Sequence, residues 1–166
     1  MSSQKDFLFD HHIINGIVPK ADAFATSGTT DWVSLANYRR VTFVIHTGNA
    51  TGGTANGTVT VNASASAAGS SSTALAFKYR ACASSTSVDT WGALTDATSS
   101  GFSMTAGDNY IYTVELTAEE VEAAAAGKYF VSLTVTESSN DPIDAAVLII
   151  LSEPRYPNPT PISAIA

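Results

Sequence analysis

The sequence is short of charge, cysteine and long apolar segments, and each shortage excludes a class of protein. Only 14% of its 166 residues are charged, and its one cysteine, Cys82, has no partner within the chain. A chain with a single cysteine cannot belong to the disulfide-stapled class of small secreted proteins. The longest apolar run, 145–151, is too short to cross a bilayer as a helix.

Basic residues are scarce as well. Eight Lys and Arg residues stand against fifteen Asp and Glu residues, which gives a net charge of −7 and a pI near 4.7. Phosphate backbones and anionic leaflets repel such a surface, so we expect neither a nucleic-acid nor a membrane partner. The first residues hold no apolar stretch of signal-peptide length, so we expect synthesis in a cytoplasm.

The residue types that carry chemistry do not form a recognisable set. Residues 10–12 (Asp-His-His) leave only His46 as a further imidazole, and no Cys-x-x-Cys or His-x-x-x-His spacing occurs. No Gly-x-Ser-x-Gly elbow accompanies the many serines, and Cys82 sits in an alternating strand pattern typical of a buried thiol. We therefore expect no catalytic residue, no metal and no cofactor, and the chain is not predicted to be an enzyme.

Strand patterns, in contrast, are abundant after about residue 30. Apolar and polar residues alternate between turns rich in Gly, Ser and Thr, with a turn signal about every ten residues. This is typical of an all-β fold, and we expect a single β-sandwich of jelly-roll or immunoglobulin-like type, although a closed barrel has the same periodicity. The strands are predicted at 32–35, 41–47, 58–63, 74–81, 101–104, 109–116, 129–135 and 145–151.

Two local patterns add detail. Thr117-Ala-Glu-Glu120 is a capping box, followed by an alanine run and Gly127, and predicts one short helix near 117–126. The run 145–151 is apolar at every position, which predicts a central strand covered on both faces.

Both ends of the chain differ from the middle. We expect an extended N-terminal arm at 1–30, a β-sandwich domain at 31–153 and a Pro-rich tail at 154–166. The turn signal Asn15-Gly16 and Pro19 argue against a packed unit in the arm. Its apolar side chains need a surface, on this protein's own sandwich or on another subunit. The candidate contact residues are Phe7, Phe9, Ile13, Ile14 and Ile17.

Four stretches carry a resemblance that spans most of the chain: 17–24 (IVPKADAF), 77–80 (FKYR), 89–94 (DTWGAL) and 147–156 (VLIILSEPRY). Together they resemble small virion structural proteins of tailed bacteriophages, of the kind that decorate or cement the capsid. The resemblance implies a β-rich module without enzymatic activity or cofactor. It implies binding to the major capsid protein on the outer surface of the head, as a trimer or dimer, in a virion made in a bacterial host.

Two other roles fit the same patterns. A phage tail-tube or head–tail joining subunit is also a β-rich protein that assembles with its neighbours. A carbohydrate-binding module uses the same sandwich, and Trp91, beside Gly92 in a predicted loop, is the aromatic residue that would serve it.

Overall fold

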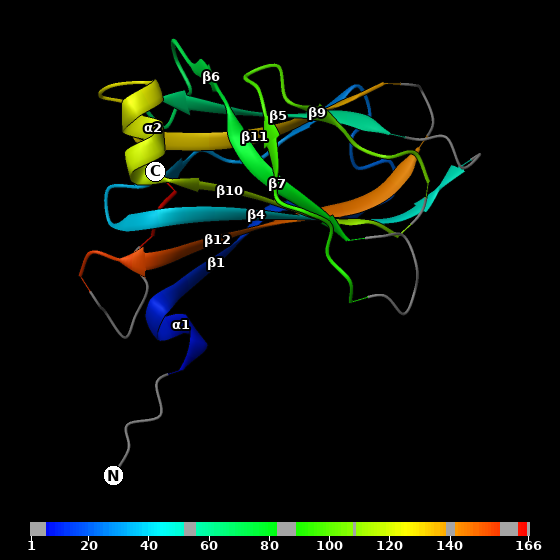
Figure 1. The fold of residues 1–166 in the computed structure, drawn as a ribbon, viewed down its shortest axis with the longest axis horizontal. Coiled ribbons are helices and arrows are strands. Elements are labelled where there is room, and N and C mark those ends of the chain that lie inside the picture. The colour runs from blue at the N-terminus through cyan, green and yellow to red at the C-terminus, as the bar shows by residue number, and fades with distance from the viewer. Residues whose placement is uncertain are drawn as a thin grey trace.

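Two antiparallel sheets form the molecule and pack together as a sandwich (Figure 1). The structure is a computed structural model, and it describes residues 6–51, 56–82, 89–107, 109–138, 142–156 and 163–165. The predicted all-β sandwich is confirmed.

The larger sheet holds strands from both ends of the chain, in the order β1-β12-β4-β10-β7-β8. These strands are β1 (His11–Lys20), β12 (Ile143–Pro154), β4 (Tyr38–Ala50), β10 (Ile111–Thr117), β7 (Phe77–Cys82) and β8 (Thr95–Ala97).

The smaller sheet has the order β2-β11-β5-β6, with β3 also pairing with β11 and β9 also pairing with β5. Its strands are β2 (Ser27–Thr29), β11 (Phe130–Glu137), β5 (Gly57–Ser64), β6 (Thr73–Leu75), β3 (Val33–Ser34) and β9 (Phe102–Ser103).

Alternation of side chains builds the core between the sheets. Val59 and Val61 of β5 and Val114 of β10 are fully buried, while the residues between them are partly exposed. Because successive side chains of a strand point to opposite faces, one face of each sheet supplies the core. The strands predicted from alternation are therefore all present, and 74–81 is divided between β6 and β7.

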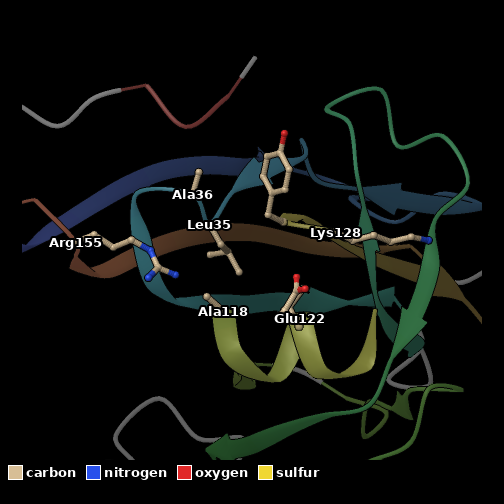
Figure 2. A pocket seen from close by; sticks show the side chains of 8 residues that line it. Leu35, Ala36, Ala118, Glu122, Lys128 and Arg155 are labelled. Carbon is tan, nitrogen blue, oxygen red and sulfur yellow. The ribbon is translucent and has the colours of Figure 1, made fainter. Parts of the chain in front are cut away.

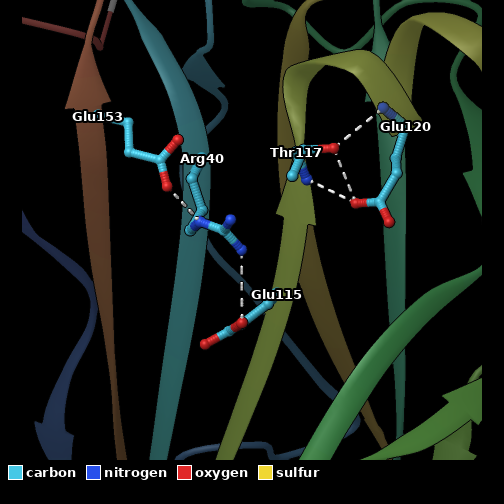
Figure 3. Close-up of polar contacts among 5 residues, drawn as sticks. All are labelled: Arg40, Glu115, Thr117, Glu120 and Glu153. Carbon is cyan, nitrogen blue, oxygen red and sulfur yellow. Dashed lines mark hydrogen bonds and ion pairs between the residues drawn. The ribbon is translucent and has the colours of Figure 1, made fainter.

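The predicted capping box forms and starts α2 (Ala118–Ala124), which connects β10 with β11 (Figure 3). Thr117 Oγ1 accepts from the backbone N–H of Glu120 at 3.2 Å, and Glu120 Oε2 accepts from the Thr117 N–H at 2.8 Å. Val121 is the buried residue of the helix. A second, single-turn helix, α1 (Phe7–Asp10), precedes β1.

The sandwich begins before Asp31, within the stretch expected to be an arm. β1 pairs with β12 and β2 pairs with β11, so residues of both strands are members of the two sheets. Asn15-Gly16 is not a hairpin turn: the register shifts there, with Asn15 opposite Leu148 and Ile17 opposite Val147. Gly16 is thus the extra residue of a β-bulge, a position at which a strand bends without ending.

The described part of the predicted tail also contacts the sandwich. β12 extends to Pro154, and at 163–165 the chain lies against β3, where the Ser34 N–H donates to the Ala164 carbonyl at 2.9 Å. The remaining predicted tail residues, 157–162 and 166, lie outside the described residues.

β12 is central in its sheet, between β1 and β4, but the prediction that both of its faces are covered is wrong. Val147, Ile149 and Leu151 are fully buried, whereas Leu148 is exposed and Ile150 is half-buried. The smaller sheet covers only one face of the larger one, so the apolar residues on the other face of β12 lie at the protein surface.

Candidate interaction surface on the larger sheet

Four aliphatic side chains from three neighbouring strands form a band on the outer face of the larger sheet. Ile13 of β1 lies opposite Ile150 of β12, and Leu148 of β12 lies opposite Val44 of β4. Ile13 is 43% exposed and Leu148 is 39% exposed, while Val44 and Ile150 are half-buried. We call Ile13, Val44, Leu148 and Ile150 the outer band.

The outer band is a consequence of strand alternation. Phe43, Ile45, Ile149 and Leu151 flank its residues in sequence, and all four are fully buried on the core side. In a sheet with one solvated face, polar residues usually occupy the outer positions. Exposed apolar residues gathered at neighbouring positions are instead typical of contact surfaces.

A charged cluster borders the outer band at the end near α2 (Figure 3). Arg40 Nε of β4 donates to Glu153 Oε1 at 2.9 Å, and its Nη1 lies 3.7 Å from Glu115 Oε2 of β10. The hydrogen bond to Glu153 raises the pKa of Arg40 above its ordinary value, so the guanidinium keeps its charge.

Further cations line the β7 side of the same face. Lys78 forms an ion pair with Asp96 of β8, and Arg80 Nη1 donates to the Gly92 carbonyl at 2.8 Å. Lys78 and Arg80 lie opposite Glu115 and Thr113 of β10, so they share the outer face. An apolar centre within a polar rim is the usual composition of a protein–protein contact.

The five residues predicted for contact divide into two groups. Phe7, in α1, is 55% exposed, Ile13 belongs to the outer band, and Phe9 is half-buried. Ile14 and Ile17 lie in the core, because β1 turns these side chains toward the smaller sheet. The protein's own sandwich is therefore the surface that covers Ile14 and Ile17.

Sequence reasoning missed Val44, Leu148 and Ile150 as surface residues. The available signal was the fully apolar run 145–151, but burial on both faces accounts for such a run equally well. Only the pairing of strands from the two ends of the chain places these residues beside Ile13.

The histidines do not converge. The His11 ring stacks on Phe7, with centroids 4.1 Å apart, and the His12 ring tilts against Tyr38. His46 lies on β4, opposite Ala146 and Ile111. Within the described part of the chain, no three His, Cys, Asp or Glu side chains are grouped so that they could hold a metal ion.

Cys82 is buried at the end of β7, where Trp91 pairs with it through an isolated β-bridge. Trp91 is 42% exposed. Its ring has no aromatic partner among the described residues.

A pocket of about 340 Å³ lies between α2 and the chain around Leu35 (Figure 2). Three charged side chains line it, and two of them are engaged: Glu122 accepts from the Gly127 N–H at 3.1 Å, and Lys128 Nζ donates to Ser71 and Thr73 away from the pocket. Arg155 is the third. The pocket's eight described lining residues include no His, Cys, Ser or Thr, so they offer no nucleophile of those types and no imidazole base.

No helix in the described ranges combines the length and the apolar character that a membrane crossing needs.

The fold defines the class of protein: an all-β sandwich, with an exposed aliphatic band on the outer face of its larger sheet. No protein-family model matches the chain, and neither does any curated protein sequence. Among solved structures, the fold is similar to that of the SPBc2 prophage-derived protein YomS, with a TM-score of 0.50 and 14% sequence identity. The match covers 87% of this chain and 94% of that one.

Proposed function

We propose that this protein is a non-enzymatic structural protein of a tailed-phage virion, which binds the major capsid protein on the outer surface of the head and stabilises it. The observation that carries the proposal is the outer band, an exposed aliphatic surface on a well-packed sandwich. The likeness in fold to a prophage-derived protein supports a phage origin. The protein acts on the assembled head, after synthesis in the bacterial host.

The chemistry of the surface suits this role. A decoration protein must stay soluble until the shell has formed, and a net charge of −7 favours solubility. The exposed area of the band is modest, so each copy binds with modest affinity. Repeated sites on a symmetric shell make such affinity sufficient when neighbouring copies are linked.

The test is binding to purified capsids that lack the decoration protein. Copies bound per capsid are counted after sedimentation, for the unchanged protein and for Leu148→Lys. We expect saturable binding that Leu148→Lys weakens about tenfold or more, because a lysine placed in an apolar contact must be desolvated. Leu94→Lys is the matched control, since Leu94 is at least as exposed, at 47% against 39%, but lies outside the band.

Substitution is a sharper test than deletion of residues 1–20, because that deletion removes β1 from the larger sheet. Absence of binding to capsids would contradict the proposal. Binding weakened equally by Leu148→Lys and Leu94→Lys would show that the outer band is not the contact.

A role as a tail-tube or head–tail joining subunit is the second candidate. The open edge of β1 favours it, because such subunits assemble by adding strands to their neighbours. Electron microscopy of the isolated protein separates the two roles. Stacked rings support the tail, and small compact oligomers support decoration.

Carbohydrate binding through Trp91 is a third candidate, favoured by the exposure of its ring. Sugar-binding sites use aromatic faces as platforms. A glycan array with Trp91→Ala as control tests it. Signals that persist unchanged in Trp91→Ala would exclude Trp91 as the platform.

A further inference from the structure

The four sheet edges differ greatly in length. β8 ends one edge with three residues, and the two edges of the smaller sheet are each formed by a three-residue and a two-residue strand, β2 with β3 and β6 with β9. β1 ends the fourth edge and has ten. Natural sheets usually end in short strands because an open edge is a template for pairing. Among the described residues β12 is the one strand that pairs with β1, and the opposite side of β1 is open (Figure 1).

The side chains along this edge are also unusual. Ile13 and Val18 are 43% and 58% exposed, and α1 places Phe7 and Leu8 at the start of the same edge. Edge strands that remain unpaired are usually protected by charges, prolines or bulges. In β1, Pro19 and Lys20 stand at the end of the strand and a bulge lies at Gly16, whereas 11–18 holds no Asp, Glu, Lys, Arg or Pro.

We infer that β1 pairs antiparallel with β1 of a second copy, about a two-fold axis at Asn15. The two sheets then join into one continuous sheet across the dimer. An antiparallel pairing of identical strands is isologous and closes at two copies. The inference does not rest on the capsid role, because it concerns the protein alone in solution.

Pairing about Asn15 keeps the side-chain faces matched across the β-bulge at Gly16. With Asn15 opposite the partner's Asn15, inward-facing Ile14 opposes the two inward-facing bulge residues, Gly16 and Ile17. Because the bulge adds one residue, Ile13 then comes opposite the partner's Val18, and both side chains face outward. Every side chain from Ile13 to Val18 thus meets one on its own face, as pairing requires.

A second register shift lies between Ile17 and Lys20, so the matched register extends from Ile13 to Val18. Within it, Ile13 of the outer band lies beside the partner's Val18. The two-fold axis makes this apolar contact twice.

Sedimentation velocity over a range of concentrations tests the inference. We expect a monomer–dimer equilibrium for the unchanged protein. Val18→Lys should weaken the dimer about tenfold or more, because each dimer would bury two extra ammonium groups beside Ile13. Ser27→Lys, on the three-residue edge strand β2, is the matched control and should leave the dimer constant unchanged.

A cysteine at the axis provides a second readout. In Asn15→Cys the two thiols lie directly opposite each other, within reach of a disulfide. We expect a covalent dimer on mild oxidation, whereas Ser27→Cys should form no covalent dimer under the same conditions. Cys82 is buried and therefore contributes little to cross-linking in either variant.

A monomer at every concentration would overturn the inference, and so would a closed trimer. A dimer that tolerates Val18→Lys, or that fails to cross-link through Asn15→Cys, would place the interface elsewhere. Failure of capsid binding with an intact β1 dimer would overturn the proposed function alone. Capsid binding by a strict monomer would overturn this inference alone.

Discussion

Tyr79 and Phe102 stack face to face, with ring centroids 3.8 Å apart and planes 3° from parallel, although they belong to different sheets. Tyr79 lies on β7 of the larger sheet, and Phe102 lies on β9, which pairs with β5 of the smaller sheet. Phe102 also meets the rings of Phe77 and Tyr112. Phe102 is therefore the centre of an aromatic cluster that joins the two layers.

Truncation of Phe102 should destabilise the sandwich. We expect Phe102→Ala to lower the free energy of unfolding by about 3–5 kcal/mol, because it leaves a cavity among three rings. Phe7→Ala, at an exposed ring, should cost less than about 1 kcal/mol. Chemical denaturation followed by tryptophan fluorescence measures both. Equal losses of unfolding free energy in Phe102→Ala and Phe7→Ala would contradict the role given to the aromatic cluster.

Alanine substitutions at two adjacent residues of β12 should differ in their effect on the free energy of unfolding. Ile149→Ala removes a fully buried side chain and should cost about 2–5 kcal/mol. Leu148→Ala, one position earlier on the outer face, should cost less than about 1 kcal/mol while it weakens contact through the outer band. Thermal unfolding beside a binding assay measures both quantities. A large stability loss in Leu148→Ala would show that the outer face is covered within the monomer.

Gly101 and Gly127 both have positive φ, at +82° and +75°, but differ in the space around them. A Cβ at Gly101 would lie 2.0 Å from the Val59 carbonyl oxygen, whereas nothing lies within 4 Å of one at Gly127. Gly127→Ala should cost about 1–2 kcal/mol from backbone strain alone. Gly101→Ala should cost clearly more, since β9 must move away from β5. Urea denaturation of the two variants compares them, and a smaller loss at Gly101 would contradict the geometry.

The capping box of α2 can be tested by two substitutions at one position. Thr117→Ala removes the hydroxyl that accepts from the Glu120 N–H and should cost about 1 kcal/mol. Thr117→Ser keeps the hydroxyl and should retain most of the stability. Denaturant midpoints of the two variants distinguish them. If the denaturant midpoint of Thr117→Ser falls as far as that of Thr117→Ala, the lost methyl group rather than the cap would be responsible for the loss of stability.

Alkaline pH should reveal the burial of Tyr112. Burial raises the pKa of its phenol above the ordinary 10.0, even though the hydroxyl accepts from the Thr105 N–H at 2.9 Å. Below pH 10 the phenol is neutral in both states and stability does not depend on it. Above pH 10 it ionises first in the unfolded chain, so stability falls as the pH rises toward the folded-state pKa.

Tyr112→Phe removes this linkage. Its stability curve above pH 10 should be shallower than that of the unchanged protein by up to about 1.4 kcal/mol per pH unit. Tyr38, whose pKa burial also raises, keeps some slope in the variant. Free energies of unfolding measured from neutral to alkaline pH give the two curves. Parallel curves would mean that Tyr112 ionises equally easily in both states.

Local patterns predicted most of the β-sandwich. Alternation located β5, β10 and β11, because their side chains divide between core and solvent, and Thr117 with Glu120 located the start of α2. The strands that the patterns missed depend on distant partners. β1 contains Asn15-Gly16 and Pro19, which favour a break, yet β12 holds it in a ladder. β2 and β8 are too short to show a period.

The outer band could not be predicted for a related reason. Its members come from positions 13, 44, 148 and 150, and only the complete sheet brings them together. An apolar run such as 145–151 indicates burial but not which of its faces is covered. The candidate residues Phe7 and Ile13 were found from their apolar character alone, which also selected the core residues Ile14 and Ile17.

The place of β12 between β1 and β4 has a consequence for biosynthesis. Both partners are translated well before β12, which follows β4 only after β5 to β11. The nascent chain must therefore carry unsatisfied β1 and β4 edges until β12 emerges, and such distant pairing slows folding. We expect chaperone dependence during expression to concentrate in this interval.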